Sequence, residues 1–120
     1  MIRTILAEDN TTTLELIESH LAIDPFIEIV GKVQTGLALI PLARNVKPDL
    51  VLMDMHMPEL NGIEATLKLK TEFKDLKIIM LTSYDLKEYR KASKDAGADA
   101  YVLKKHMYNE LLPTIYGLFS

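Results

Sequence analysis

Five short apolar runs, separated by segments with helical periodicity, constrain the fold of this chain more than any other feature. The expected strands are Ile2–Ala7, Phe26–Val33, Leu50–Met53, Lys77–Leu81 and Ala100–Leu103. Leu50–Met53 is apolar at every position, a pattern typical of a strand that is covered on both faces. Between the runs, apolar residues recur at helical spacing, as Leu14, Ile17 and Leu21 do.

Helices are expected in all five segments that follow the strands. They are Asn10–Ala22, Leu37–Val46, Asn61–Phe73, a segment that Asp85 begins and Gly97 ends, and Tyr108–Phe119. Strict alternation of strands and helices predicts an α/β fold, a (βα)5 doubly wound parallel sheet with helices on both faces.

Capping residues and prolines refine the expected helix boundaries. Asn10 and Thr12 are alternative caps for the first helix, and Thr12 with Glu15 would form a capping box. Asp85 with Glu88 predicts a second capping box. Two prolines, Pro41 and Pro113, lie inside expected helices, so each helix is expected to be kinked there or to begin later.

Composition excludes several classes of protein. The chain has 120 residues, 48% of them hydrophobic and 26% charged, as expected for one globular domain that spans residues 1–120 without a second domain. It has no cysteine, which excludes disulfides and thiolate metal sites. No secretory leader or membrane-spanning run is visible, so the cytoplasm is the expected location. A net charge of −3 argues against direct nucleic-acid binding by this domain.

Polar residues whose side chains can bind ligands or take part in reactions follow four of the five expected strands. Ligands of an open parallel sheet bind outside the carboxyl ends of its strands. The residues expected at that edge are Glu8 and Asp9, Asp54, Thr82 and Ser83, and Lys104 and Lys105. A single acid at a strand end is more often a helix cap or a solvated loop residue, but the combination points to a functional site.

Three carboxylates that lie close together repel one another unless a cation is present. Oxygen ligands without cysteine or clustered histidine favour Mg²⁺, which retains water ligands and accepts phosphate oxygens. Lysine and threonine side chains are suitable partners for those oxygens. The residues therefore predict phosphoryl chemistry on a carboxylate with Mg²⁺ as cofactor.

Four sequence blocks resemble those of bacterial response regulator receiver domains over the whole chain. They are ILAEDN at 5–10, PDLVLMDMHMPELNG at 48–62, MLTSY at 80–84 and AGADAYVLKK at 96–105. The resemblance implies a flavodoxin-like fold with strand order 2-1-3-4-5. The third of these blocks and the block AGADAYVLKK look most like those of regulators whose second domain is a DNA-binding helix-turn-helix.

The same resemblance implies roles for the residues at the expected site. Asp54 would accept the phosphoryl group as an acyl phosphate. Asp9 would bind Mg²⁺ directly, and Glu8 would bind it largely through metal-bound water. The backbone carbonyl of His56 would be a further metal ligand.

A second set of implied roles concerns the phosphoryl group and the output. Lys104 would pair with phosphoryl oxygens, and Thr82 would move to hydrogen-bond them while Tyr101 turns inward behind it. This movement would switch the surface formed by the fourth helix, fifth strand and fifth helix. Expected partners are a sensor histidine kinase, a second copy of the chain after phosphorylation, and a C-terminal DNA-binding domain outside this chain.

Two positions, Lys105 and Glu8, depart from the commonest pattern of the family. Lys105 stands where members often have a proline after a cis peptide bond, and a cis bond between Lys104 and Lys105 would be costly without that proline. Glu8 replaces the usual aspartate. His56 and Tyr84, two residues beyond Asp54 and Thr82, are expected to line the route of water to the phosphoryl group.

Two other functions remain open from the sequence. An aspartate-nucleophile phosphatase would place a second acid two residues after its nucleophile, where this chain has His56. A receiver-like domain that takes no phosphate and only binds partners is the other alternative. Together, Glu8, Asp9, Asp54, Thr82 and Lys104 favour the phosphoacceptor.

Overall fold

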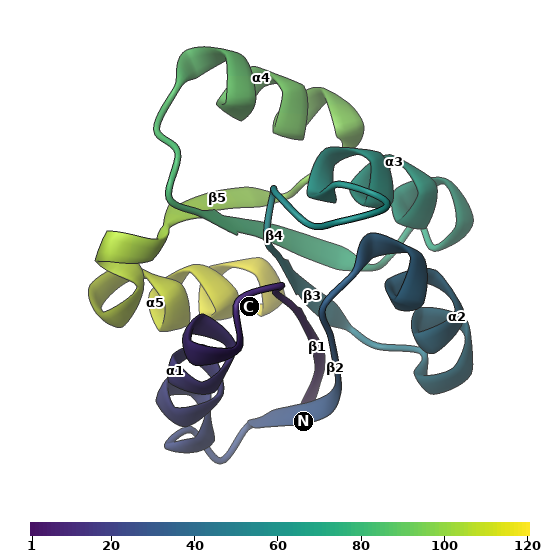
Figure 1. The fold of residues 1–120 in the computed structure, drawn as a ribbon. Coiled ribbons are helices and arrows are strands. Elements are labelled where there is room, and N and C mark those ends of the chain that lie inside the picture. Colours follow the sequence, from purple (N-terminus) through teal and green to yellow (C-terminus); the bar gives the residue numbers. More distant parts are fainter.

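A computed structural model describes residues 1–120 as five strands that alternate with five helices (Figure 1). The strands are β1 (Ile2–Ala7), β2 (Ile27–Val33), β3 (Leu50–Met53), β4 (Lys77–Thr82) and β5 (Ala100–Leu103). The helices are α1 (Thr11–Ala22), α2 (Gly36–Val46), α3 (Gly62–Glu72), α4 (Lys87–Ala96) and α5 (Met107–Phe119), with a short 3-10 helix η1 (Lys104–His106) before α5. No helix is long and apolar enough to span a membrane.

All strand pairs are parallel, and the strand order is β2-β1-β3-β4-β5. The predicted doubly wound sheet and the order implied by the resemblance are both confirmed. Leu52 of β3 pairs with Leu6 of β1 on one side and with Ile79 of β4 on the other. β3 is therefore the central strand, and its carboxyl end lies in the middle of the sheet edge.

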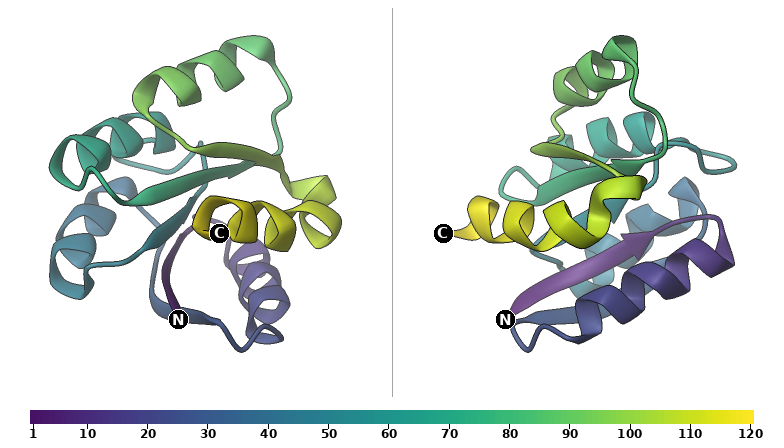
Figure 2. Two further views of the ribbon diagram at one scale, coloured as in Figure 1. Left: turned by 180° about the vertical axis from the view of Figure 1, so that it is seen from behind. Right: turned by 90° about the vertical axis from the view of Figure 1, so that its left-hand side faces the viewer.

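Helices cover both faces of the sheet, with α1 and α5 on one face and α2, α3 and α4 on the other (Figure 2). Successive strand residues point to opposite faces. Val51 belongs to the core beneath α2 and α3, whereas its neighbour Leu52 belongs to the core beneath α1 and α5. Because both faces are buried, both sets of residues are apolar, which explains the continuous apolar run of β3.

The first helix begins where one of the two predicted caps places it. Asn10 is the N-cap of α1, and its side chain accepts a hydrogen bond of 2.9 Å from the backbone N–H of Thr13. The predicted capping box of Thr12 and Glu15 is wrong, because the helix already includes Thr12. Each N-cap side chain binds an N–H two or three residues ahead, so only the residue before the first turn can serve.

The predicted capping box of Asp85 and Glu88 is also wrong. Helix α4 begins at Lys87, and the N-cap position is Leu86, which offers no side-chain hydrogen bond. Asp85 lies in the preceding loop and instead accepts a hydrogen bond of 2.8 Å from Nε of Arg90. The predicted end of the helix is confirmed, because Gly97 is the C-cap with a left-handed φ of 110°.

Both prolines lie inside continuous helices. Pro41 is in α2, which begins at Gly36, and Pro113 is in α5, which begins at Met107. The alternative that each helix begins later than its expected first residue, Leu37 or Tyr108, is therefore wrong. The chain contains no cis peptide bond, so the bond between Lys104 and Lys105 is trans.

Candidate functional site

The ends of β1 and β3 bring the acidic residues together. Ala7 pairs with Met53 in the parallel register, and the backbone N–H of Asp54 donates to the carbonyl of Ala7 at 2.9 Å. The residues that follow these two strands therefore start side by side. The start of α3 packs closely on the backbone of Asp54, because a Cβ at Gly62 would lie only 2.2 Å from the carbonyl oxygen of Asp54.

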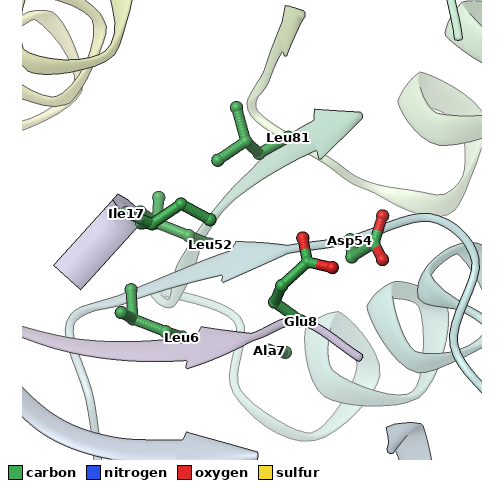
Figure 3. Close-up of a pocket in the computed structure, with 7 residues that line it drawn as sticks. All are labelled: Leu6, Ala7, Glu8, Ile17, Leu52, Asp54 and Leu81. Carbon is green, nitrogen blue, oxygen red and sulfur yellow. The ribbon is translucent and has the colours of Figure 1, made fainter. Parts of the chain in front are cut away.

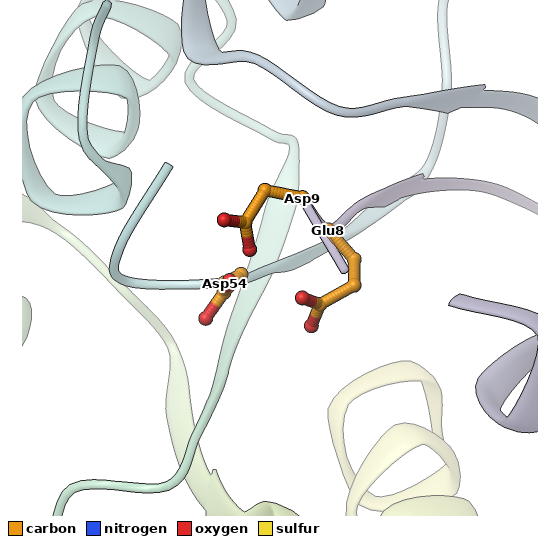
Figure 4. A group of neighbouring side chains, drawn as sticks. All are labelled: Glu8, Asp9 and Asp54. Carbon is orange, nitrogen blue, oxygen red and sulfur yellow. The ribbon is translucent and has the colours of Figure 1, made fainter. Parts of the chain in front are cut away.

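Three carboxyl groups converge at this edge, as Figure 4 shows. Oxygen atoms of Glu8, Asp9 and Asp54 all lie within 4.8 Å of one another. Glu8 and Asp54 are buried, with 2% and 6% of their surface exposed, whereas Asp9 is exposed. The predicted acidic group is therefore assembled, with one open side. His56, the fourth predicted ligand through its backbone carbonyl, follows in the β3–α3 loop with an exposed side chain.

Lys104, the first residue after β5, reaches back to two of these acids. Its Nζ lies 2.7 Å from Oε1 of Glu8 and 3.4 Å from Oδ1 of Asp54. Burial lowers the pKa of Lys104, but the hydrogen bond to Glu8 and the charge of Asp54 outweigh it, so that the pKa is raised above its ordinary value. The ammonium group is therefore held in its charged form between the two buried carboxylates.

The environment of Asp54 favours its protonated form when no metal is bound. Glu8 and Asp54 lie over a pocket lined by apolar side chains (Figure 3), namely Leu6, Ala7, Ile17, Leu52 and Leu81. Burial raises the pKa of Asp54 most, the negative charge of Glu8 raises it further and Lys104 opposes both, with a result of about 7. The positive charge of Lys104 therefore does not offset the effects of burial and of the neighbouring acids on this pKa.

The donor set fits a hard divalent cation. All three side chains offer carboxylate oxygens, one side of the group is open, and the negative charge exceeds the charge of Lys104. These are the ligands that Mg²⁺ prefers, and its octahedral geometry leaves positions for water or phosphate oxygens. Charge and ligand type therefore agree with the metal predicted from the sequence.

Thr82 ends β4 and is fully buried. The register pairs Met53 with Met80 and Thr82 with Leu103, so Thr82 lies at the same sheet edge, between the ends that carry Asp54 and Lys104. Its hydroxyl oxygen accepts a hydrogen bond of 3.2 Å from the backbone N–H of Tyr84. The threonine is thus positioned beside the acids and tied to the β4–α4 loop.

Tyr101 of β5 is attached to the same loop. Its hydroxyl donates to the carbonyl oxygen of Tyr84 at 2.5 Å, and burial raises the pKa of this hydroxyl. The guanidinium carbon of Arg90 lies 4.6 Å from the centre of the Tyr101 ring, and Arg90 also binds Asp85. Both predicted switch residues, Thr82 and Tyr101, therefore bond to the backbone of Tyr84.

Sequence reasoning missed how Tyr89 and Arg90 take part in this arrangement. Neither residue was named among the expected site residues. One feature could have found them. The chain has five tyrosines, and three of them, Tyr84, Tyr89 and Tyr101, fall on or beside the β4–α4 loop. Such a concentration marks a place where aromatic contacts join segments.

Comparison with known proteins agrees with this geometry. The family model described as "Response regulator receiver domain" matches residues 4–116. The "Uncharacterized transcriptional regulatory protein YhcZ" of Bacillus subtilis is 39% identical over 113 residues, which are 94% of this chain and 53% of YhcZ. The "Response regulator protein VraR" of Staphylococcus aureus is 38% identical over 105 residues, which are 86% of this chain and 49% of VraR.

A solved structure extends the comparison. The DNA-binding response regulator of the LuxR family from Staphylococcus aureus has a TM-score of 0.86 at 27% identity, with 100% of both chains covered. The names of these proteins agree with the DNA-binding subfamily predicted from the sequence. The chain spans about half the length of the curated relatives it matches. With a family model over most of its length and relatives at this identity, the chain belongs to the response regulator receiver domains of two-component signal transduction.

Proposed function

We propose that Asp54 is the phosphoacceptor of this domain and that the reaction requires Mg²⁺. A carboxylate oxygen of Asp54 attacks the phosphorus of a phosphohistidine on a sensor kinase. A P–O bond forms as the P–N bond breaks, and the histidine nitrogen keeps the electron pair and takes a proton. The observation that carries the proposal is the buried Asp54 carboxyl within reach of both Lys104 and two further acids.

Mg²⁺ bound by Glu8, Asp9, Asp54 and the carbonyl of His56 would supply the positive charge that lets a phosphoryl dianion approach this acidic edge. Lys104, whose Nζ contacts Glu8 and Asp54, contributes a second positive charge, and its three N–H donors can bind phosphoryl oxygens. The apolar floor beneath Asp54 excludes water from one side of the carboxyl group.

The same proposal covers the output. Thr82 turns its hydroxyl toward the phosphoryl group and in doing so releases the backbone N–H of Tyr84. The carbonyl oxygen of the same residue accepts the hydrogen bond of Tyr101. The loop then shifts and changes the surface formed by α4, β5 and α5. The domain, residues 1–120, catalyses only its own phosphorylation and dephosphorylation. A sensor histidine kinase, a second copy and a DNA-binding output domain that regulates transcription are its proposed partners.

Intact mass spectrometry after incubation with Mg²⁺ and a small phosphodonor tests the proposal. The wild type should gain the mass of one phosphoryl group, and chelation of Mg²⁺ should prevent the gain. Asp54→Asn should remain unlabelled, whereas Asp75→Asn, which changes an exposed aspartate in the α3–β4 turn, should be labelled like the wild type.

Three results would overturn the assignment. Labelling of Asp54→Asn at the wild-type rate would place the phosphoryl group elsewhere. Consumption of many equivalents of donor without a stable adduct would indicate a phosphatase, and no labelling under any condition would indicate an interaction domain that takes no phosphate.

A further inference from the structure

Three aromatic rings meet between the phosphorylation site and α4. The rings of His56 and Tyr84 lie 4.5 Å apart at an interplanar angle of 69°. The ring of Tyr89 lies 5.8 Å from His56 and 5.7 Å from Tyr84, at angles of 79° and 82°. All three pairs are edge-to-face contacts of the kind that stabilises aromatic pairs beyond their buried area.

The first two rings belong to the loops that carry the site. His56 is two residues beyond Asp54, and Tyr84 is two residues beyond Thr82, so their contact joins the β3–α3 loop to the β4–α4 loop. Tyr84 also holds the Thr82 hydroxyl through its N–H and the Tyr101 hydroxyl through its carbonyl. The two rings therefore belong to the loops that follow Asp54 and Thr82.

The third ring belongs to α4, which is otherwise weakly attached at its beginning. The buried residues of α4 are Ser93 and Ala96, both in its second half, and its N-cap residue Leu86 makes no side-chain hydrogen bond. Tyr89 is partly buried and packs against the core beneath α2 and α3. In the first turn of α4, Arg90 contacts Tyr101 and Asp85, and Tyr89 is the side chain that packs against the core.

We propose that Tyr89 is a positioning residue that links the first turn of α4 to the phosphorylation site through the rings of His56 and Tyr84. This inference rests on the proposed phosphorylation of Asp54. When the three rings are in contact, His56 and Tyr84 are held over the loops beside Asp54 and restrict the approach of water. Loss of the acyl phosphate requires that water attack phosphorus, with Asp54 leaving as a carboxylate and phosphate released. A partner that displaces α4 would separate the rings and shorten the life of the phosphoryl group.

Substitution of the α4 ring tests this link. Tyr89→Leu keeps an apolar side chain but removes the ring, and it should increase the rate of loss of the phosphoryl group from Asp54 by about threefold or more. Tyr89→Phe keeps the ring and should restore the wild-type rate. The matched control is Tyr108→Leu on α5, because Tyr108 also makes an edge contact with a histidine, His20, at 5.0 Å and 79°. The control should lose phosphate like the wild type.

A second set of measurements separates a positioning role from a general loss of packing. In a His56→Ala background, Tyr89→Leu should change the dephosphorylation rate less than it does in the wild type, because the ring through which it acts is gone. Hydrogen exchange of the α4 amides should respond to beryllofluoride in the wild type and in Tyr89→Phe, and respond less in Tyr89→Leu.

The outcomes distinguish this inference from the function on which it rests. If wild-type Asp54 takes no phosphoryl group, the proposed function fails and the link fails with it. If Asp54 is labelled but Tyr89→Leu loses phosphate at the wild-type rate, the link alone is wrong. Equal effects of Tyr89→Leu with and without the His56 ring would likewise overturn it.

Discussion

At the scale of single residues, the protonation of Asp54 determines how the metal-free protein responds to pH. The pKa of Asp54 is raised from its ordinary value of 3.8 to about 7, so the folded state binds this proton more tightly than the unfolded state does. The stability that this group contributes is fully present below about pH 4 and is lost as the pH rises through about 7. The full difference amounts to about 2–4 kcal/mol.

Urea unfolding in the presence of a chelator should reveal this effect. Asp54→Asn removes the titrating group, so it should be more stable than the wild type at about pH 8 and should lose most of this advantage at about pH 5. Saturating Mg²⁺ should stabilise the wild type at the higher pH, where the three acids are charged, and have less effect on the variant. An advantage of Asp54→Asn that is equal at both pH values would contradict the raised pKa.

At the scale of the elements, the β4–α4 loop is held by a closed set of contacts around Tyr101. Arg90 stacks on the Tyr101 ring and binds Asp85, while the Tyr101 hydroxyl binds the carbonyl of Tyr84. The interaction of an arginine with an aromatic face near the surface contributes about 0.5–1 kcal/mol, and an exposed ion pair adds less. These contacts are therefore strong enough to bias the loop and weak enough for the proposed phosphorylation to reverse them.

Arg90→Ala should loosen this loop without unfolding the domain. We expect faster hydrogen exchange in residues 83–87 and altered ring resonances of Tyr101, with a loss of about 1 kcal/mol or less in the free energy of unfolding. Lys91→Ala is the matched control, because Lys91 is the neighbouring cation and pairs only with exposed Asp95. Similar exchange in both variants would show that Arg90 does not hold the loop.

The helices and strands were largely predictable from the sequence, whereas the exact start of α4 was not. The apolar run of β3 fixes a buried strand because only such a strand needs apolar residues on both faces. Convergence of Glu8, Asp9, Asp54 and Lys104 followed from the rule that parallel strands end at one edge. The start of α4 was misplaced because Asp85 and Glu88 have the right spacing for a capping box. In the structure, Asp85 lies in the preceding loop and accepts a hydrogen bond from Arg90 instead.

The contacts among the rings of His56, Tyr84 and Tyr89 could not be predicted from the sequence. Whether Tyr89 meets His56 and Tyr84 depends on the rotation of α4 about its axis and on the course of two loops. Neither is encoded in a periodicity or a spacing. Tertiary packing of a few side chains decides both, and so the link between α4 and the site appears only in three dimensions.

At the scale of the whole molecule, the proposed switch predicts a response that spreads from the site to one side of the sheet. Beryllofluoride with Mg²⁺ should change hydrogen exchange across residues 83–110 in the wild type, because Thr82 and Tyr101 both bind the backbone of Tyr84. Thr82→Ala should still bind the mimic but lose much of the distant response, by an amount that corresponds to about 1–3 kcal/mol of coupling. Changes confined to the loops around Asp54 in the wild type, or unchanged by Thr82→Ala, would contradict this route.

The direction of the strands has a practical consequence for attaching other molecules to the domain. All five strands point their carboxyl ends toward Asp54, while β1 starts and α5 finishes at the opposite edge of the sheet, where both termini lie (Figure 2). A fluorescent protein or a surface anchor joined at Met1 or Ser120 would therefore stand on the side away from the acidic residues. Immobilised by either end, the domain would present its proposed phosphorylation site outward, toward a kinase added in solution.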